Sequence, residues 1–520
     1  MQTRRWPLTV FAAALALYLL TASGQMRDRD GRTMLASARA FALRGSWELQ
    51  RAETSELLGV VEGRGLQSMF APGYAVALVP AAWLGERLVA ATGHPQFADF
   101  PPALLNAVFS AATVGVLCHT VLLLGFSRGR ATLLCAAYAV ASPAFVYAKW
   151  AGSEPLAMLL VAVAFDAALG WSRGGRARHC VLAMLAGVGA ALTRYPLAVL
   201  LPIMGLYLWS SGPPKRRGLA ALVAVAGLAV ALALLLWDND SRFGSAVITG
   251  YTLYARAEGG NRLVLDTDII TRGLLQMTLS PSRGIVWYFP LVVLLPWAGR
   301  RCRTKTRRLL AAAAVLTVTF ALVVSAFDLL SARGPIWIGG WGPRLIMPAL
   351  PALFLLTAQA SRALRRSALA PILVAGLLAN LPAVLLNYHR ADREFRYLQA
   401  NGNLPDAGPR SETWSLAGAP IILQCRALAW SLGAGTPPPP TTAAARTLRE
   451  AIDAAPTLTT VPDCWWWYAR AFRGRTVDAR GEVPPDASVT ARENLCDGPQ
   501  IGYTQYSQYV KSGRAAPAQD

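Results

Sequence analysis

Two aspartates, Asp28 and Asp30, stand one residue apart just beyond the first apolar segment of the chain. A carboxylate this close to membrane hydrocarbon is costly unless it is paired or has a function. A carboxylate held there can take a proton from a hydroxyl group, which is the task of a general base. The alternative is a solvated surface turn in which Arg27 and Arg29 neutralise the two aspartates.

Further polar and aromatic side chains recur where the predicted spans end on the same side of the membrane. They lie in four segments: Lys149 with Ser153-Glu154-Pro155, Thr193-Arg194-Tyr195-Pro196, Ser280-Pro281-Ser282-Arg283-Gly284, and Trp341-Gly342-Pro343-Arg344. Taken singly, a Trp at an interface is more often a membrane anchor, and an Arg at a helix end usually extends into the headgroups. Together, three arginines on the outer side contradict the usual placement of basic residues.

Guanidinium groups bind phosphate through two parallel hydrogen bonds, so this set predicts an anionic lipid headgroup. The candidate contacts to the donor phosphate are Arg344, Arg283, Arg194 and Lys149. The candidate substrate contacts are Glu154, Trp341 and Tyr74, the last within Ala71-Pro72-Gly73-Tyr74.

Composition places these residues in a membrane protein. The chain has 520 residues, of which 54% are hydrophobic and 15% charged, and its mean hydropathy is +0.37. Those values exclude an ordinary soluble enzyme. The net charge of +21 would suit nucleic acid, but Lys and Arg stand in short tracts between apolar segments and form no patch with aromatic residues. We therefore expect membrane lipids as partners and no nucleic acid.

Eleven apolar segments are predicted to span the membrane, which gives an all-α polytopic fold. The basic tracts between them contain no acid, and they share one side if Ala75–Leu84 does not cross. The positive-inside rule then puts the N-terminus in the cytoplasm and the C-terminal region outside. Signal-peptide cleavage near residues 22–24 is the alternative for the first segment. The predicted spans are Pro7–Ser23, Pro101–Phe126, Ala131–Tyr147, Glu154–Trp171, Cys180–Thr193, Tyr195–Trp209, Gly218–Trp237, Ile285–Ala298, Leu309–Phe327, Leu345–Ala360 and Ala368–Asn387.

The two long hydrophilic regions are predicted to lie outside. The loop 24–100 holds an amphipathic helix, Thr33–Leu43, that suits a membrane surface. It also holds Ala75–Leu84, which we expect to be re-entrant or interfacial because it is short and Pro80 breaks it. The region 391–520 contains a Pro-rich linker at 435–442 and a short helix at 444–455. Residues 415–432 are apolar enough for a twelfth span, but Gln424, Cys425 and Arg426 favour a surface helix.

The cysteines have no CxxC or His/Cys ligand spacing, so no zinc site is indicated. Cys425, Cys464 and Cys496 lie in the external region, where a disulfide can persist. Three thiols allow three pairings, among which the sequence does not choose; a bond between Cys464 and Cys496 is the hypothesis to test.

Displacement at an activated sugar suits the predicted site. A carboxylate would take the proton from an acceptor hydroxyl, while cations stabilise the leaving phosphate. An enzyme facing outward cannot rely on cytosolic nucleotide sugars, whereas a sugar on a lipid phosphate is already in the bilayer.

The order of the motifs resembles that of the bacterial GT-C-type membrane glycosyltransferases, which are related to aminoarabinose transferases and protein O-mannosyltransferases. The resemblance covers roughly residues 1–390 and implies a GT-C-like bundle in the bacterial plasma membrane. It implies an inverting glycosyltransferase that moves a sugar from a polyprenyl-phosphate donor to an envelope lipid, glycan or protein. It rests on Asp28-Arg29-Asp30-Gly31, Ala71-Pro72-Gly73-Tyr74, Ser153-Glu154-Pro155, Ser280-Pro281-Ser282-Arg283-Gly284 and Gly339-Gly340-Trp341-Gly342-Pro343-Arg344, in that order.

The family's acidic base lies in the first external loop, which implies that Asp30 is the base and Asp28 the second choice. The sequence departs from relatives that carry an Asp-Glu pair there and a Lys-Pro-Pro at the re-entry. Ala71 stands where the second motif would begin to be basic, so the phosphate contact falls elsewhere. Some relatives hold a divalent metal; this chain has four histidines and no visible ligand set, so no metal ligand is assigned.

Two other classes of protein stay open. A multi-pass transporter or lipid flippase would place ionisable groups near the midplane, often in repeated halves. Here Asp166 is the clear acid inside a predicted span, it lies near the cytoplasmic end, and no internal repeat is found. A non-catalytic binding subunit of the same fold is the other alternative.

Overall fold

The computed structural model describes residues 2–22, 24, 26, 28–51, 57–150, 152–258, 266–298, 304–326, 341–386, 389–404 and 416–453. Within these ranges the chain is almost entirely α-helical, and its strands form one two-stranded hairpin. Seven helices are long and apolar enough to cross a membrane, and three shorter apolar helices accompany them. The predicted class, an all-α polytopic membrane protein, is confirmed.

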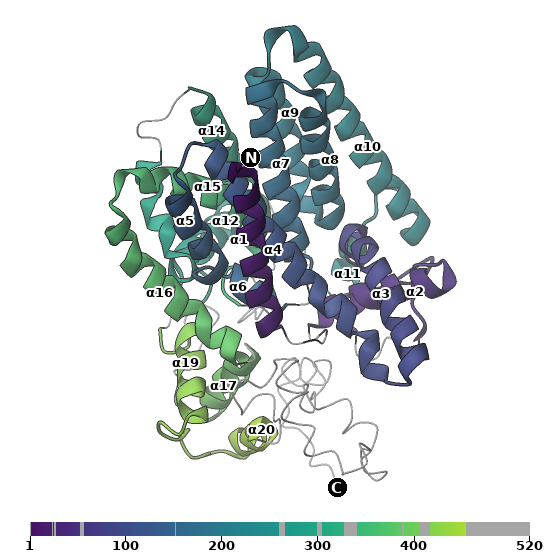
Figure 1. The fold of residues 1–520 in the computed structure, drawn as a ribbon. Coiled ribbons are helices and arrows are strands. Elements are labelled where there is room, and N and C mark those ends of the chain that lie inside the picture. The colour runs from purple at the N-terminus through teal and green to yellow at the C-terminus, as the bar shows by residue number, and fades with distance from the viewer. Residues whose placement is uncertain are drawn as a thin grey trace.

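Figure 1 shows these helices gathered into one bundle, with α1 beside α4 near its centre. The bundle consists of α1 (Gln2–Thr21), α4 (Phe100–Leu123), α5 (Arg128–Val140), α6 (Ala144–Tyr147), α7 (Glu154–Gly174), α8 (Ala177–Thr193), α9 (Leu200–Ser211), α10 (Arg217–Phe243), α12 (Thr267–Leu279), α13 (Ile285–Tyr288), α14 (Thr304–Ser325), α15 (Leu350–Ala360) and α16 (Arg366–Leu385). Short 3-10 segments join or precede some of them: η3 (Tyr195–Val199), η5 (Pro290–Trp297) and η7 (Arg344–Ala349).

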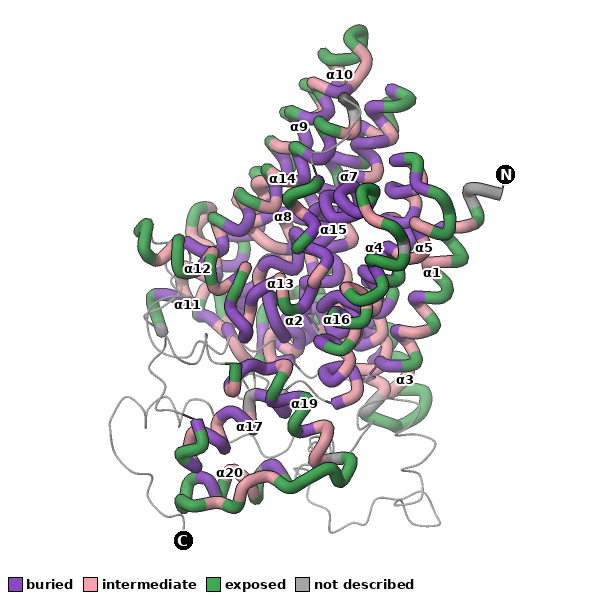
Figure 2. The backbone as a smooth tube through the Cα atoms, turned by 90° about the vertical axis from the view of Figure 1, so that its left-hand side faces the viewer, coloured by how far each residue is buried: buried purple, intermediate pink, exposed green. Residues whose placement is uncertain are grey.

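Small residues let the central helices approach closely, as in other membrane bundles. Buried alanines occur along α7 and α8, including Ala157, Ala164 and Ala183. A Cβ at Gly115 of α4 would lie 3.0 Å from Phe11 of α1. Burial falls from the centre outward: 94% of the window around α15 is buried, against 11% of that around α10. Figure 2 shows this gradient, so α10 turns an apolar face to the lipid.

Two predicted spans are interrupted along their length. The segment Ile285–Ala298 forms the four-residue α13 and then the 3-10 segment η5, because Pro290 and Pro296 disturb the α-helical hydrogen bonds. The segment Ala131–Tyr147 divides into α5 and α6, separated by a turn that contains Pro143. Each segment was predicted as one span, and each contains two helical pieces.

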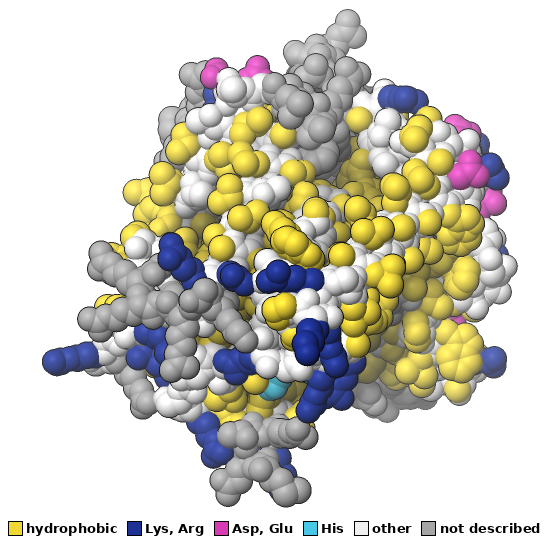
Figure 3. Space-filling view, turned by 90° about the horizontal axis from the view of Figure 1, so that it is seen from above, with side chains coloured by type: hydrophobic (Ala, Val, Ile, Leu, Met, Phe, Trp, Pro, Cys, Tyr) yellow, Lys and Arg dark blue, Asp and Glu magenta, His cyan; other side chains and the backbone are white. Residues whose placement is uncertain are grey.

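The basic tracts gather at one end of the bundle, as the sequence predicts. Arginines there bind carbonyl groups of neighbouring tracts: Arg130 donates to Leu364 O at 3.0 Å and Arg362 to Leu124 O at 2.7 Å. Arg216 bonds to Gly175 O and Arg308 to Ser210 O. Figure 3 views this face and shows Lys and Arg spread over it, with Asp and Glu at its margin. That this end is cytoplasmic stays a prediction.

The loop 24–100 is folded at the other end of the bundle. It contains α2 (Arg29–Arg44), the hairpin β1 (Val60–Gly63) and β2 (Gly65–Ser68), and α3 (Pro72–Thr92). The predicted amphipathic helix corresponds to α2, which buries Met34, Leu35 and Ala38.

The expectation that Pro80 breaks the following segment was wrong. The helix α3 continues through Pro80 for 21 residues. Figure 1 places α3 beside α2. Gly73 of α3 packs against the end of α8, where a Cβ at this position would lie 2.7 Å from backbone atoms of Leu192 and Thr193. The helix is long enough to span, and its interfacial position stays a prediction.

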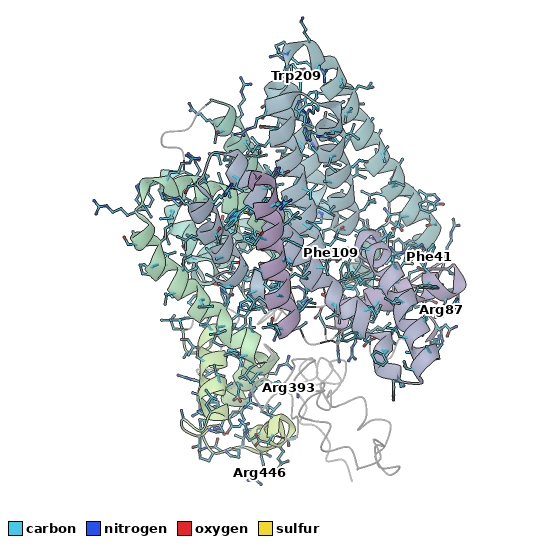
Figure 4. The ribbon with its side chains drawn as sticks, in the orientation of Figure 1. Phe41, Arg87, Phe109, Trp209, Arg393 and Arg446 are labelled. Carbon is cyan, nitrogen blue, oxygen red and sulfur yellow. The ribbon has the colours of Figure 1, made fainter. Side chains whose placement is uncertain are left out.

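The described part of the C-terminal region forms a small helical unit. It comprises α17 (His389–Ala400), α19 (Pro420–Ser431) and α20 (Ala443–Asp453), near Arg393 and Arg446 in Figure 4. Phe395, Leu398, Leu423 and Ile452 make its core. With 12 residues, α19 is too short to be a twelfth span, which agrees with a surface helix.

The predicted linker 435–442 packs onto α17, where Asn401 Nδ2 donates to Pro439 O at 3.0 Å. Cys425 is exposed and unbonded. Cys464 and Cys496 lie outside the described residues, and the boundary near residue 390 stays a prediction.

The orientation can be tested with single cysteines in a chain whose Cys302, Cys425, Cys464 and Cys496 are replaced by serine. Gly129 and Gly218 are exposed at the basic end, and Asp268 is exposed on α12. A membrane-impermeant maleimide should label a cysteine at 268 in intact cells, and those at 129 and 218 only after lysis. Labelling of 129 or 218 in intact cells would overturn the orientation.

Candidate functional site

The structure brings Asp28 and Asp30 together with residues more than a hundred positions away. Asp28 is the residue before the first turn of α2, and Asp30 lies within that turn. Acidic groups are favourable at this end of a helix because the backbone N–H groups there point outward. Asp28 is buried, and its Oδ2 atom makes no hydrogen bond within the described part of the chain.

Arg344 lies at the centre of the cluster. Its Nη2 lies 2.6 Å from Asp30 Oδ2 and 3.6 Å from Asp28 Oδ2, and its Nε lies 2.7 Å from Glu154 Oε1. Its Cζ stands 5.0 Å from the centre of the Trp150 ring, a cation–π distance. One guanidinium group therefore holds three carboxylates.

The backbone before Arg344 explains how this side chain reaches the cluster. Gly342 has φ +58°, a left-handed conformation that suits glycine, and a Cβ there would lie 2.7 Å from the ring of Tyr288. Trp341 is buried, its Nε1 donates to Asn380 Oδ1 at 3.1 Å, and its carbonyl accepts from Tyr147 Oη at 3.0 Å. These contacts hold the start of η7 against the bundle.

Glu154 stands at the first turn of α7 and is fully buried. Its Oε1 accepts from Arg344 and also from Arg194 Nη1, at 3.2 Å. Its Oε2 has no hydrogen-bond partner among the described residues. With every carboxylate ionised, the three acids and two guanidinium groups carry one net negative charge.

Electrostatics give Asp28 a distinct state. Burial raises the pKa of Asp28 well above its ordinary value, and the neighbouring Asp30 raises it further, against the opposing effect of Arg344. A proton on Asp28 removes the net negative charge of the cluster.

The remaining predicted residues lie around the cluster. Tyr74 is fully buried on α3, within electrostatic reach of Asp28 and Glu154. Lys149 Nζ donates to Val384 O at 2.6 Å. Arg283 is partly buried near Tyr147 and Tyr288, and in the described part of the chain no carboxylate lies within ion-pair distance of it. Burial lowers the pKa of Arg283 to about 10.

Three neighbours were not singled out from the sequence. Trp150 covers Arg344, and Asn106 of α4 donates to Gly152 O at 2.9 Å and to Trp150 O. Tyr251 lies on α11 (Gly250–Glu258), within electrostatic reach of Arg194 and Asp30. Burial raises the pKa of Tyr251 to about 12. Asn106 could have been found from the sequence, because it is a polar residue within an apolar segment. The sequence gives no comparable indication for Tyr251.

The cluster does not fit a divalent cation as it stands. The guanidinium of Arg344 lies between the carboxylates, where a cation would have to bind, and would repel it. Within the described ranges, no group of three His, Cys, Asp or Glu residues could hold a metal.

Fold and site define the class: an all-α polytopic membrane protein with a buried acid–arginine cluster at one end of the bundle. Among solved structures, the chain is similar to ArnT from Cupriavidus metallidurans, crystallised bound to undecaprenyl phosphate. The two are 15% identical over 82% of this chain and 79% of that chain, with a TM-score of 0.49. No protein-family model and no curated protein matches the chain.

The first prediction from this geometry concerns stability. Arg344→Gln leaves buried carboxylates without their counter-charge, so we expect a loss of about 3–5 kcal/mol. Thermal unfolding in detergent measures it, with Arg64→Gln as the control. The pair of Arg64 with Asp240 is exposed, and such pairs contribute about 0–1 kcal/mol. Adding Glu154→Gln should cost less than the two single changes together. An Arg344→Gln protein as stable as the wild type would contradict this assignment.

The second prediction concerns pH. Because folding raises the pKa of Asp28, the folded state binds more protons between the unfolded and folded pKa values, and stability falls as pH rises through that window. Asp28→Asn removes this titration. The variant should therefore gain stability relative to wild type at neutral pH and lose that advantage near pH ~4. Unfolding midpoints across this range measure the difference; a variant equally destabilised at every pH would disprove it.

Proposed function

We infer that the chain is an inverting glycosyltransferase of the bacterial cell envelope, which transfers a sugar from a polyprenyl-phosphate donor to an acceptor outside the cytoplasm. The observation that carries this proposal is the buried cluster itself. Two candidate bases, Asp28 and Asp30, are held beside arginines at one end of a membrane bundle. The order of the sequence motifs, which resembles that of GT-C-type enzymes, supports the same conclusion.

In this proposal Asp30 is the general base. Its carboxylate is oriented by Arg344 and is more exposed than that of Asp28. The acceptor oxygen forms a bond to the anomeric carbon while its proton passes to Asp30. The bond from that carbon to the donor phosphate breaks on the opposite face, and its electron pair leaves with the polyprenyl phosphate. Configuration at the anomeric carbon is therefore inverted.

The donor phosphate needs a cation whose charge or N–H donors are not already engaged by the protein. Arg344 and Arg194 both pair with Glu154, and Lys149 bonds to a backbone carbonyl. Among the described residues, Arg283 has the phenols of Tyr147 and Tyr288 as its electrostatic neighbours. We therefore give Arg283 the first place among the four candidate phosphate contacts. Glu154, Tyr74 and Trp341 line the substrate side of the cluster or support it.

The placement of the cluster favours an enzyme over a transporter. Transporters commonly bind their substrate near the bilayer midplane. Here Glu154 and Asn106 stand within the first two turns of α7 and α4, at the ends of these helices. A flippase and a non-catalytic subunit remain the outcomes that the assay below distinguishes.

Asp30→Asn should abolish most transfer, because it retains the volume of the side chain but cannot accept the proton. We expect a fall in kcat of ~10²–10⁴-fold, with little change in donor binding, and a smaller effect for Asp28→Asn. The assay is transfer from a radiolabelled polyprenyl-phosphate sugar by purified protein in detergent, with exposed Asp240→Asn as the control. A flippase or binding subunit would show no transfer. Wild-type speed in Asp30→Asn would refute the assignment of the base.

Arg283→Gln should weaken donor binding, since a charge-assisted hydrogen bond contributes about 1.5–3 kcal/mol. That corresponds to a KM for the donor about 10- to 100-fold higher. Arg344→Lys keeps one charge but loses the planar geometry that orients Asp30, so it should lower kcat more than it raises KM. An unchanged donor KM in Arg283→Gln would remove this residue from the phosphate site.

A further inference from the structure

The arginines at the basic end of the bundle fall into two groups. Those of the first group serve the fold, because they donate to carbonyl groups where helices end. Arg308 bonds to the carbonyl of Ser210 in the last turn of α9, and Arg362 bonds to that of Leu124, 2.7 Å away, just after α4. Such contacts satisfy the last carbonyl groups of a helix, which have no partner within it.

Arg128 and Arg217 form the second group. Both are exposed, and the guanidinium group of neither makes a hydrogen bond or ion pair with another residue of the described chain. Each guanidinium instead lies by an indole: Arg128 Cζ is 6.0 Å from the Trp6 ring centre and Arg217 Cζ is 5.8 Å from that of Trp209. An indole typically lies at the depth of the lipid headgroups. The cation–π contact thus holds each charge at that depth and leaves its N–H donors available.

An apolar strip begins directly beside Arg217. Trp209 lies at the tip of the α9–α10 pair in Figure 4 and is 47% exposed. A Cβ at Gly205 would lie 2.9 Å from Ala224, so α9 and α10 pack closely, and Leu206 and Leu222 are both about two-thirds exposed. A cation next to an exposed apolar strip matches an amphiphile with a negative headgroup.

The surrounding charge favours the same ligand. Figure 3 shows Lys and Arg gathered on part of this face of the bundle. Among the described residues, the acidic side chain at this end of the bundle is that of Asp166. Its Oδ1 lies 2.8 Å from His119 Nδ1 and accepts a hydrogen bond from Thr120 Oγ1, also at 2.8 Å. Each basic residue near an anionic membrane surface adds to the attraction for anionic lipid.

We propose that Arg217 and Trp209, with Arg128 and Trp6, bind the phosphate headgroups of anionic phospholipids in the leaflet at the basic end, and that one acyl chain lies along α9 and α10. The site is at the opposite end of the bundle from the acid–arginine cluster. It is therefore independent of the proposed transferase activity.

Thermal unfolding of the purified full-length chain in detergent tests the proposal. Phosphatidylglycerol should raise the unfolding midpoint of the wild type, whereas phosphatidylcholine and inorganic phosphate should not. The variant Arg128→Gln/Arg217→Gln should unfold at the wild-type midpoint without lipid and lose more than half of the phosphatidylglycerol effect. The matched control Arg308→Gln/Arg362→Gln removes the same charge; it should unfold at a lower temperature but keep the lipid effect.

Native mass spectrometry of the folded fraction gives a second measurement. Arg128→Gln/Arg217→Gln should retain fewer phosphatidylglycerol molecules than the control variant, even if its stability differs from expectation. Equal retention by the two variants would overturn the proposal. An equal stabilisation by phosphatidylcholine or by inorganic phosphate would also overturn it, because the first would indicate the acyl chains alone and the second a phosphate site without lipid.

Discussion

The organisation of the functional end depends on the side chain of Arg344. Asp28, Asp30 and Glu154 come from two helices that could not bury their carboxylates together without a shared counter-charge. Arg344 supplies that charge from the first residue of η7, which packs against α7. Its own position depends on the left-handed conformation of Gly342 and on the packing of Trp341 against Asn380. The loop 24–100, α7 and η7 are thus fixed relative to one another by one guanidinium group.

The same helices that carry the cluster also carry polar groups at their other end. Twelve residues separate Glu154 from Asp166 on α7, a rise of about 18 Å. His119 pairs with Asp166 and lies on α4, thirteen residues after Asn106. Between these two levels the described residues of α4 and α7 carry no Asp, Glu, Lys or Arg. The two polar ends are therefore separated by an apolar section, which suits chemistry at one face better than a path through the middle.

Sequence patterns predicted the class of fold, because membrane spans leave a strong compositional signal. They also indicated that Asp28, Asp30, Glu154, Arg194 and Arg344 belong to one end of the bundle, and the structure brings these five residues together. Hydropathy could not show that Ile285–Ala298 is interrupted or that α3 continues through Pro80. Pro290 and Pro296 interrupt the first segment, whereas α3 tolerates Pro80, and the hydropathy of the two segments does not distinguish these outcomes.

The roles within the cluster depend on contacts that spacing does not reveal. From the sequence, Arg344 and Arg283 were both candidates for the phosphate, and Arg344 was the first choice. In the structure Arg344 is surrounded by carboxylates, whereas Arg283 has phenols as its electrostatic neighbours. Even with a proton on Asp28, the acid cluster has no net positive charge with which to attract a phosphate. If the proposed reaction is correct, the donor phosphate binds on the side of Arg283 and the acceptor hydroxyl on the side of Asp30. That separation is what an inverting displacement requires, because the nucleophile and the leaving group occupy opposite faces of the sugar.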